Sequence, residues 1–254
     1  MCRDPILGLD KDGVRQTILA SARRMGLEPH LRRAQDAFTP RSQLRNRRDD
    51  AHLYAIMAAV LAPDANCVDI GANAGDVLRV MVRHASRGHH IAYEPLPDLA
   101  GSLVDQFPGV DVRNVAISDA AGKATFYRDT GSDSRSSLRP SRGCEPLTVR
   151  VETLDADLPE GYRPDFVKID VEGAELAVLR SGAETLARHR PYIVFEHGAS
   201  SAAFGTTHRM MHDFLTGELG MRIFDMDGDG PFDADEFDLV ADPPGDRWNF
   251  IACP

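Results

Sequence analysis

Four side chains at the ends of two predicted strands have the chemistry to move a proton or to hold a metal ion. The apolar runs "DFVKID" and "YIVFEH" predict buried strands, and they end in Asp170, Glu196 and His197, with Glu172 two residues beyond the first run. Histidine, with a reference pKa of about 6.5, is the natural general base near neutral pH. The candidate catalytic residues are therefore His197, Asp170 and Glu172. Alternatively, Asp170, Glu196 and His197 form a carboxylate-rich set that could bind Mg²⁺ or Mn²⁺.

Nearby acidic and histidine residues have simpler explanations. Glu175 lies at the predicted start of the next helix, where negative charge stabilises the helix N-terminus, and we expect it to have that structural role. His208 and His212 have the i, i+4 spacing of a metal-binding pair, but the sequence shows no third ligand.

The segment "VDIGANAGD" predicts a strand that ends in a glycine-rich turn. Its D-x-G-x-N-x-G-D spacing, from Asp69 to Asp76, lacks two of the three glycines of a dinucleotide-binding fingerprint. Carboxylates at Asp69 and Asp76 would repel a pyrophosphate and suit a cationic ligand with an amino-acid tail, such as S-adenosylmethionine. Glu94, at the end of the next strand "HIAYE", is placed to accept hydrogen bonds from a ribose diol.

The segment "DMDGDGPFDADE" (225–236) has the ligand spacing of a calcium-binding EF-hand loop. Its flanks, however, favour another structure. "GMRIFDM" enters the loop with the alternation of a strand, whereas an EF-hand needs an entering helix. The exit, "FDLVADPPGD", is too short for a helix before Pro243 and Pro244. We therefore expect a β-turn region between the last two strands.

Predicted strands and helices alternate along most of the chain, which indicates a mostly parallel sheet with helices on both faces. The last two strands have no predicted helix between them and should form an antiparallel hairpin at the sheet edge. A ligand is then expected at the carboxyl ends of the first strands. The predicted strands are 66–70, 90–94, 110–117, 165–170, 192–197, 221–226 and 247–252, with extended excursions at 123–127 and 147–151. The predicted helices are 13–28, 50–62, 76–86, 97–106, 174–188 and 206–217.

Length and composition narrow the class of protein. A chain of 254 residues can form one α/β domain with an appendage, and we expect a helical extension over 1–62 and the main domain over 63–254. The net charge of −10 argues against nucleic acid or an anionic membrane as partner. No stretch of 18 apolar residues and no N-terminal apolar run occurs. Four scattered cysteines fit a reducing compartment, so a cytoplasmic location is expected.

The chain resembles the FkbM-type S-adenosylmethionine-dependent O-methyltransferases from about residue 66 to 252. The resemblance is carried by "VDIGANAGD", "YEPLPD", "NVAISDAAGKATFY", "VETLDADL", "DFVKIDVEGAELAVLRSGAETL", "RPYIVFEH" and "WNFIA". It implies a class I methyltransferase (Rossmann-like) sheet of seven strands, the last antiparallel. It also implies transfer of a methyl group to a hydroxyl of a small molecule, such as a sugar or secondary metabolite. The residues expected at the cofactor are Asp69, Gly71, Asn73, Gly75, Asp76, Glu94, Pro95, Asn114, Val115, Ala116 and Asp170.

Other functions remain open from the sequence. The chain could be a nucleotide-cofactor-binding regulatory module without catalysis, or a nicotinamide-dependent oxidoreductase, although the acidic turn counts against the latter. Substrate contacts are expected from the N-terminal helices, which could also support a homo-oligomer, and from the loop 128–143. The arginines of that loop, Arg128, Arg135, Arg139 and Arg142, could bind an anionic group.

Overall fold

The computed structural model describes residues 41–129, 138, 144–241 and 247–254. The chain divides into two compact units, Met1–Arg48 and Asp49–Pro254, and helix α3 (Arg41–Val60) crosses the division. The predicted helix 13–28 and most of the loop 128–143 lie outside the described residues, so a helical extension over 1–62 stays a prediction.

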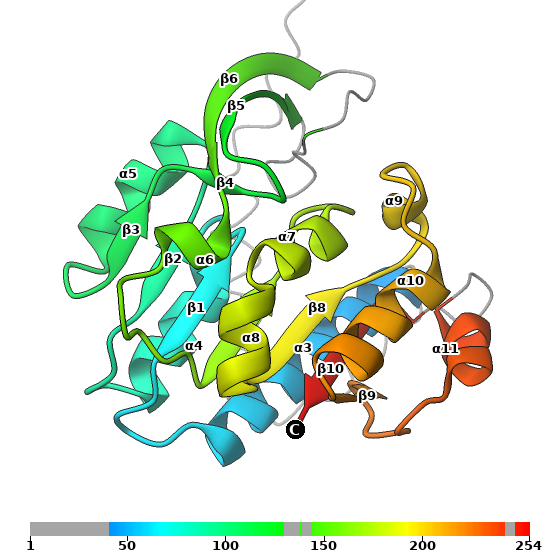
Figure 1. Ribbon diagram of the computed structural model, residues 1–254. Helices are drawn as coiled ribbons and strands as arrows, with labels where there is room; N and C mark the ends of the chain where they lie inside the picture. The colour runs from blue at the N-terminus through cyan, green and yellow to red at the C-terminus, as the bar shows by residue number, and fades with distance from the viewer. Residues whose placement is uncertain (1–40, 130–137, 139–143, 242–246) are drawn as a thin grey trace, which may run out of the picture. The chain divides into compact units, whose positions relative to one another are not determined.

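The main sheet has seven strands in the order β3-β2-β1-β7-β8-β10-β9 (Figure 1). Its strands are β1 (Cys67–Ile70), β2 (Ile91–Tyr93), β3 (Asp111–Arg113), β7 (Phe166–Ile169), β8 (Tyr192–Glu196), β9 (Arg222–Asp225) and β10 (Asn249–Cys253). All neighbouring pairs are parallel except those of β10, which is antiparallel to both β8 and β9. The predicted fold class and the antiparallel pairing of the last two strands at the sheet edge are therefore confirmed, although a helix lies between these strands and they do not form a simple hairpin. The strand order reverses between β1 and β7, which is where open α/β sheets bind ligands.

The expected third strand, 110–117, is two strands in different sheets. β3 belongs to the main sheet, whereas β4 (Ala116–Ile117) pairs with β6 (Cys144–Glu152), which in turn pairs with β5 (Gly122–Asp129). The chain turns at Asn114, whose side-chain amide donates to the carbonyl oxygens of Glu94 and Pro95, at 2.8 and 3.0 Å. The two extended segments predicted outside the main sheet are β5 and β6, and together with β4 they form a second sheet in the order β4-β6-β5. This sheet lies beside the carboxyl end of β2.

Helices cover both faces of the main sheet because each strand presents apolar side chains to both sides. One face packs on α3, α4 (Asp76–His84) and α5 (Pro97–Gln106), with Leu53, Met81 and Leu103 in its core. The other face, turned toward the viewer in Figure 1, packs on α7 (Glu175–Ser181), α8 (Ala183–His189) and α10 (His208–Asp213). Three shorter helices, α6 (Leu154–Asp157), α9 (Ala199–Ala202) and the π-helix η2 (Phe214–Glu218), complete this side together with α11 (Ala234–Val240).

The predicted helix 174–188 is divided at Gly182. A Cβ atom there would lie 2.6 Å from Leu154 Cδ2, so glycine permits α6 to pack against the junction of α7 and α8. None of the described helices combines the length and the apolar character needed to cross a membrane.

The calcium-like segment is a strand, a turn and a helix. β9 enters as a strand, as expected, and Gly228 N–H donates to Asp225 O in the expected turn. The expectation that no helix follows is wrong, because α11 begins directly after Asp233. The Asp233 carboxylate accepts from the N–H groups of Asp235 and Glu236, and Glu236 accepts from the N–H of Asp233. This is a capping box, which shares the i, i+3 acidic spacing of positions nine and twelve of a calcium loop.

The first three acidic positions of the segment also have partners other than a metal ion. Asp225 is buried, and its Oδ1 accepts from the N–H groups of Asp227 and Asp229, each at 2.9 Å. Its Oδ2 lies 2.5 Å from Arg247, which also pairs with Asp229 at 3.2 Å. The segment therefore anchors Arg247 and the start of β10.

Candidate active site

The glycine turn after β1 lies against the end of β7. Gly71 has φ +78°, and a Cβ atom there would lie 1.9 Å from the carbonyl oxygen of Asp170, so no larger residue fits. The N–H groups of Gly71 and Ala72 both donate to Tyr93 O. Gly75 has a packing role instead, because a Cβ atom there would lie 2.7 Å from Leu103 and Phe107 of the α5 segment.

Lys168 supports this turn from beneath. Its ammonium group donates to Gly71 O at 2.7 Å and lies 3.4 Å from carboxylate oxygens of both Asp69 and Asp170. Burial by itself would lower the pKa of Lys168, but the two carboxylates outweigh burial and raise it, so the ammonium stays charged. Asp69 is fully buried beside it. Asp69 therefore holds the scaffold of the turn and does not reach the ligand pocket expected for it.

Glu94 connects the two turns at the carboxyl ends of β1 and β2. Its side chain is 4% exposed, and its two carboxylate oxygens accept from Asn73 N–H and Leu96 N–H, at 2.8 and 2.9 Å. Burial raises the pKa of Glu94, and the two N–H donors act in the opposite direction. Each oxygen has a second lone pair, so the fixed carboxylate can still accept hydrogen bonds from a ligand.

A pocket with about 660 Å³ of empty space, including its opening, lies above these turns. The pocket is lined by Ile70, Gly71, Asn73, Tyr93, Glu94, Pro95, Leu96, Val115, Ala116, Ile117, Phe126, Leu138, Asp170, Val171, Glu172 and Ala174. The lining combines carboxylates with apolar side chains.

The pocket brings together most of the cofactor residues predicted from the sequence. It is lined by Gly71, Asn73, Glu94, Pro95, Val115, Ala116 and Asp170, but not by Asp69, Gly75, Asp76 or Asn114. Asp76 is exposed and opens α4, and Asn114 holds the turn after β2. Phe126 also lines the pocket and is not predicted from the sequence, because the position of the second sheet beside the pocket depends on the turn at Asn114.

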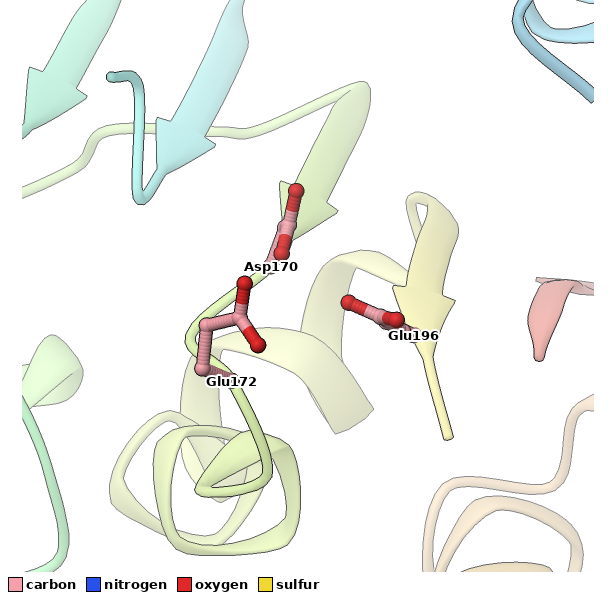
Figure 2. A group of neighbouring side chains, drawn as sticks. All are labelled: Asp170, Glu172 and Glu196. Carbon is pink, nitrogen blue, oxygen red and sulfur yellow. The ribbon is translucent and has the colours of Figure 1, made fainter. Parts of the chain in front are cut away.

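Three carboxylates gather at the edge of this pocket (Figure 2). Asp170 and Glu172 follow β7, Glu196 ends β8, and one oxygen from each lies within 4.8 Å of the others. Burial, and then the negative charges of Asp170 and Glu172, raise the pKa of Glu196 far above its usual range. Glu172 has φ +57°, an uncommon backbone conformation for a residue other than glycine. The cluster can therefore retain a proton at neutral pH and exchange it with a bound molecule.

Glu175 has a structural role, although not by capping its own helix alone. Its carboxylate accepts from the N–H groups of Val171 and Gly173, at 3.2 and 2.9 Å, and so fixes the loop that carries Glu172. Burial raises the pKa of Glu175 to about 7.

His197 does not join the carboxylates, which corrects both roles expected for it. Its side chain is fully buried, its Nε2 lies 2.8 Å from His208 Nδ1, and its ring stacks on Phe237 at 5.7 Å. Successive residues of a strand point to opposite faces, so Glu196 and His197 could not both face the pocket. Burial, followed by His208, lowers the pKa of His197 to about 3. The position expected for His197 in the cluster is taken by Glu172.

The other expected side chains outside the pocket have structural contacts. His208 contacts His197, and His212 packs on Phe237, so the i, i+4 pair belongs to an aromatic cluster. Arg128 forms an ion pair with Asp98 at 2.7 Å. The remaining arginines of that loop, Arg135, Arg139 and Arg142, lie outside the described residues.

A parallel sheet with this strand order, one antiparallel strand and a pocket at the switch point is the architecture of the class I S-adenosylmethionine-dependent methyltransferases. A family model described as the methyltransferase FkbM domain matches residues 69–223, and the chain belongs to this family.

Similar proteins occur among characterised sequences and among solved structures. The 2-O-methyltransferase NoeI of Sinorhizobium fredii (strain NBRC 101917 / NGR234) is 27% identical over 156 residues, which cover 53% of this chain and 64% of that protein. Methyltransferase FkbM from Methylobacillus flagellatus KT is a solved structure with 14% identity and a TM-score of 0.49, over 77% of this chain and 45% of the other. The O-methyltransferase TomG from Streptomyces achromogenes, solved with S-adenosylmethionine, has 13% identity and a TM-score of 0.45, over 79% and 77% of the two chains. The chain thus spans less than two thirds of NoeI and of the Methylobacillus protein.

Proposed function

We propose that this methyltransferase transfers the methyl group of S-adenosylmethionine to a hydroxyl of a small molecule, a sugar or a secondary metabolite. The observation that carries the proposal is the Asp170–Glu172–Glu196 cluster at the edge of the pocket. Transfer to a hydroxyl needs a group that accepts the hydroxyl proton, and a carboxylate with raised proton affinity, as Glu196 is, can accept it. The name of the relative NoeI, a 2-O-methyltransferase, supports the choice of oxygen.

The residues of the pocket fit the cofactor. Glu94 is held rigidly by two N–H donors and keeps lone pairs for the ribose hydroxyls, while Val115, Ala116 and Phe126 give an apolar wall for the adenine. Gly71 lets the backbone approach the amino-acid portion. When bound, the cofactor supplies a methyl group on a good leaving group, so the chain's main tasks are to orient the hydroxyl and to accept its proton.

The cluster performs the second task in this proposal. Burial and the negative charges of Asp170 and Glu172 make Glu196 bind a proton more strongly than a lone carboxylate does. Glu196 loses its own proton only as the pH rises through its raised pKa. Turnover should therefore increase with pH above neutrality, since loss of that proton increases the proton-accepting capacity of the cluster.

The same three oxygens are ligands of the type that Mg²⁺ and Mn²⁺ bind. A metal-assisted version of the reaction, with Glu172 in the place expected for His197, is the second candidate. Exhaustive chelation followed by Mg²⁺ or Mn²⁺ addition separates the two. Full activity after chelation supports the carboxylate base, whereas loss that is restored by the metal supports the second candidate.

The decisive experiment is a substrate screen with S-adenosylmethionine that carries a labelled methyl group, followed by mass detection and NMR of the product linkage. We expect methyl ethers, and we expect deoxy analogues that lack the acceptor hydroxyl to give no product. Glu196→Gln should lower turnover about 10²–10⁴-fold and leave the affinity for S-adenosylhomocysteine unchanged. Glu218→Gln, on the exposed end of η2, is the matched control. Methylation of nitrogen or carbon in place of oxygen would overturn the proposal.

A further inference from the structure

A second cavity lies beside the carboxylate cluster, apart from the cofactor pocket. It has about 690 Å³ of empty space, including its opening, and is formed by the end of β8, the α9 segment, the end of α11 and the start of β10. Its lining residues are Glu172, Glu196, Gly198, Ala199, Ser200, Ala241, Arg247 and Trp248. Glu172 lines both this cavity and the cofactor pocket. A molecule in the second cavity therefore meets Glu172 and Glu196 directly, while Glu172 is also in reach of a molecule in the cofactor pocket.

We propose that this cavity is the acceptor site and that it selects acceptors without negative charge. The inference rests on the proposed function, because it assigns the place where the hydroxyl-bearing molecule binds. Four features carry it: the shared carboxylates, the charge of the lining, the tryptophan on its wall and the fixed backbone beneath that tryptophan.

The charge of the lining is negative where the acceptor would bind. Glu172 and Glu196 face the cavity, and Asp170 lies within the same cluster. Arg247 is the sole cation among the described residues that line the cavity, and its guanidinium is already paired with Asp225 and Asp229. Even when Glu196 holds its proton, a carboxylate or phosphate on the acceptor would meet the negative charge of the cluster and would find no unpaired cation among the described residues that line the cavity, which is unfavourable in a partly buried site.

Hydroxyl groups suit the same lining. Carboxylate oxygens accept hydrogen bonds from O–H donors, and Trp248 provides a flat apolar surface for the carbon skeleton of the acceptor. Trp248 is held in place through its backbone, since its carbonyl oxygen accepts from His197 N–H at 2.7 Å. The next residue, Asn249, donates to the buried carboxylate of Asp49 at 3.0 Å. The calcium-like segment, which anchors Arg247, thus fixes one wall of the cavity.

The sequence makes the test direct, because Trp248 is the only tryptophan of the chain. Its fluorescence reports binding in this cavity without any need for turnover. With S-adenosylhomocysteine present, we would titrate matched pairs of probes that share a skeleton and differ in charge. Suitable pairs are glucose and glucuronate, galactose and galacturonate, and 4-hydroxybenzyl alcohol and 4-hydroxybenzoate. We expect saturable changes with uncharged members, and affinities at least about tenfold weaker for their anionic partners.

Two variants show whether the probes that change the fluorescence of Trp248 bind in this cavity. Ala199→Phe places a ring in the cavity and should weaken the binding of the uncharged probes at least about tenfold, while calorimetry shows unchanged affinity for S-adenosylhomocysteine. Ala62→Phe is the matched control, because Ala62 is also exposed and lines a separate cavity near Arg163 and Tyr192. It should change neither affinity.

The outcomes are distinct for the two proposals. Saturable binding of uncharged probes that Ala199→Phe weakens, without formation of any methyl ether, would retain this acceptor site and overturn transfer to oxygen. Methylation of a probe with no response of Trp248 and no effect of Ala199→Phe would retain the proposed function and overturn this site. Equal or tighter binding of the anionic members, or no binding by any uncharged probe, would overturn the charge selection.

Discussion

At the scale of single residues, Lys168 has the largest predicted effect on stability. It is the buried cation between Asp69 and Asp170, and it also supports the glycine turn. Lys168→Met leaves the buried Asp69 carboxylate without compensation, so we expect a loss of about 3–5 kcal/mol in the free energy of unfolding, measured by urea denaturation. Asp69→Leu in the same protein should recover much of this loss, because it removes the uncompensated charge. A single variant as stable as the wild type would contradict this role.

His197 predicts a pH dependence of stability. The pKa of its folded form is lowered to about 3, from its ordinary value of 6.5, so below about pH 6.5 the unfolded chain binds a proton that the folded chain does not. Stability therefore falls as the pH drops through this window, with a slope of up to about 1.4 kcal/mol per pH unit for this group. The comparison is between the wild type and His197→Gln, each with and without His208→Gln, by urea denaturation at pH 7 and pH 5, since the histidines that do not contact His197 contribute equally to all four proteins. Identical pH dependence of the proteins with and without His197 would show that His197 does not titrate differently on folding.

Individual residue roles could be predicted from the sequence only in part. Glu94 and Asp170 were found because strand ends meet at one edge of a parallel sheet. Asp69 and His197 were misplaced for the same physical reason: strand residues alternate between faces, so a polar residue next to a site residue points away from it. Each is buried by contacts that the local sequence does not show: Asp69 lies against Lys168 of β7, and His197 lies against His208 and Phe237.

At the scale of elements, a substitution at the start of α11 distinguishes two roles of the acidic segment, stabilising a helix and binding calcium. Asp233 caps α11, so Asp233→Ala should cost about 1 kcal/mol of stability, measured by thermal or urea unfolding. Addition of about 1 mM Ca²⁺, well above the sensor range of calcium affinities, should leave the Tm of both the wild type and the variant unchanged. A calcium-dependent rise in Tm that the substitution abolishes would show that the segment is a calcium site.

Elements were predicted best where burial alone determines them. The strands of the main sheet are short apolar runs between turn signals, and they were placed to within a few residues. The division of 110–117, the break at Gly182 and the helix α11 were missed because each depends on a specific contact: the Asn114 amide, the close approach of Leu154, and a capping box whose spacing coincides with that of a calcium loop.

At the scale of the whole Asp49–Pro254 unit, the two sheets should respond together to the cofactor. Phe126 of the second sheet and Glu94 of the main sheet line the same pocket. Binding of S-adenosylhomocysteine should therefore slow hydrogen exchange in 116–129 and 170–176, because local opening of these segments must release the ligand. Segments 198–202 and 234–240 should be unaffected and serve as the internal control. Equal protection of all four segments would show that the ligand stabilises the unit as a whole.

The order of the two cavities along the chain has a consequence for engineering. The cofactor pocket is built from residues 70–174 and the proposed acceptor cavity from residues 172–248, and Glu172 is common to both linings. A chimera joined after Ala174, with the first part from this chain and the rest from another member of the family, would take the whole proposed cofactor pocket from this chain and all of the acceptor cavity except Glu172 from the other parent. Acceptor preference could then be exchanged between family members as a single contiguous cassette, without redesign of the part that binds the methyl donor.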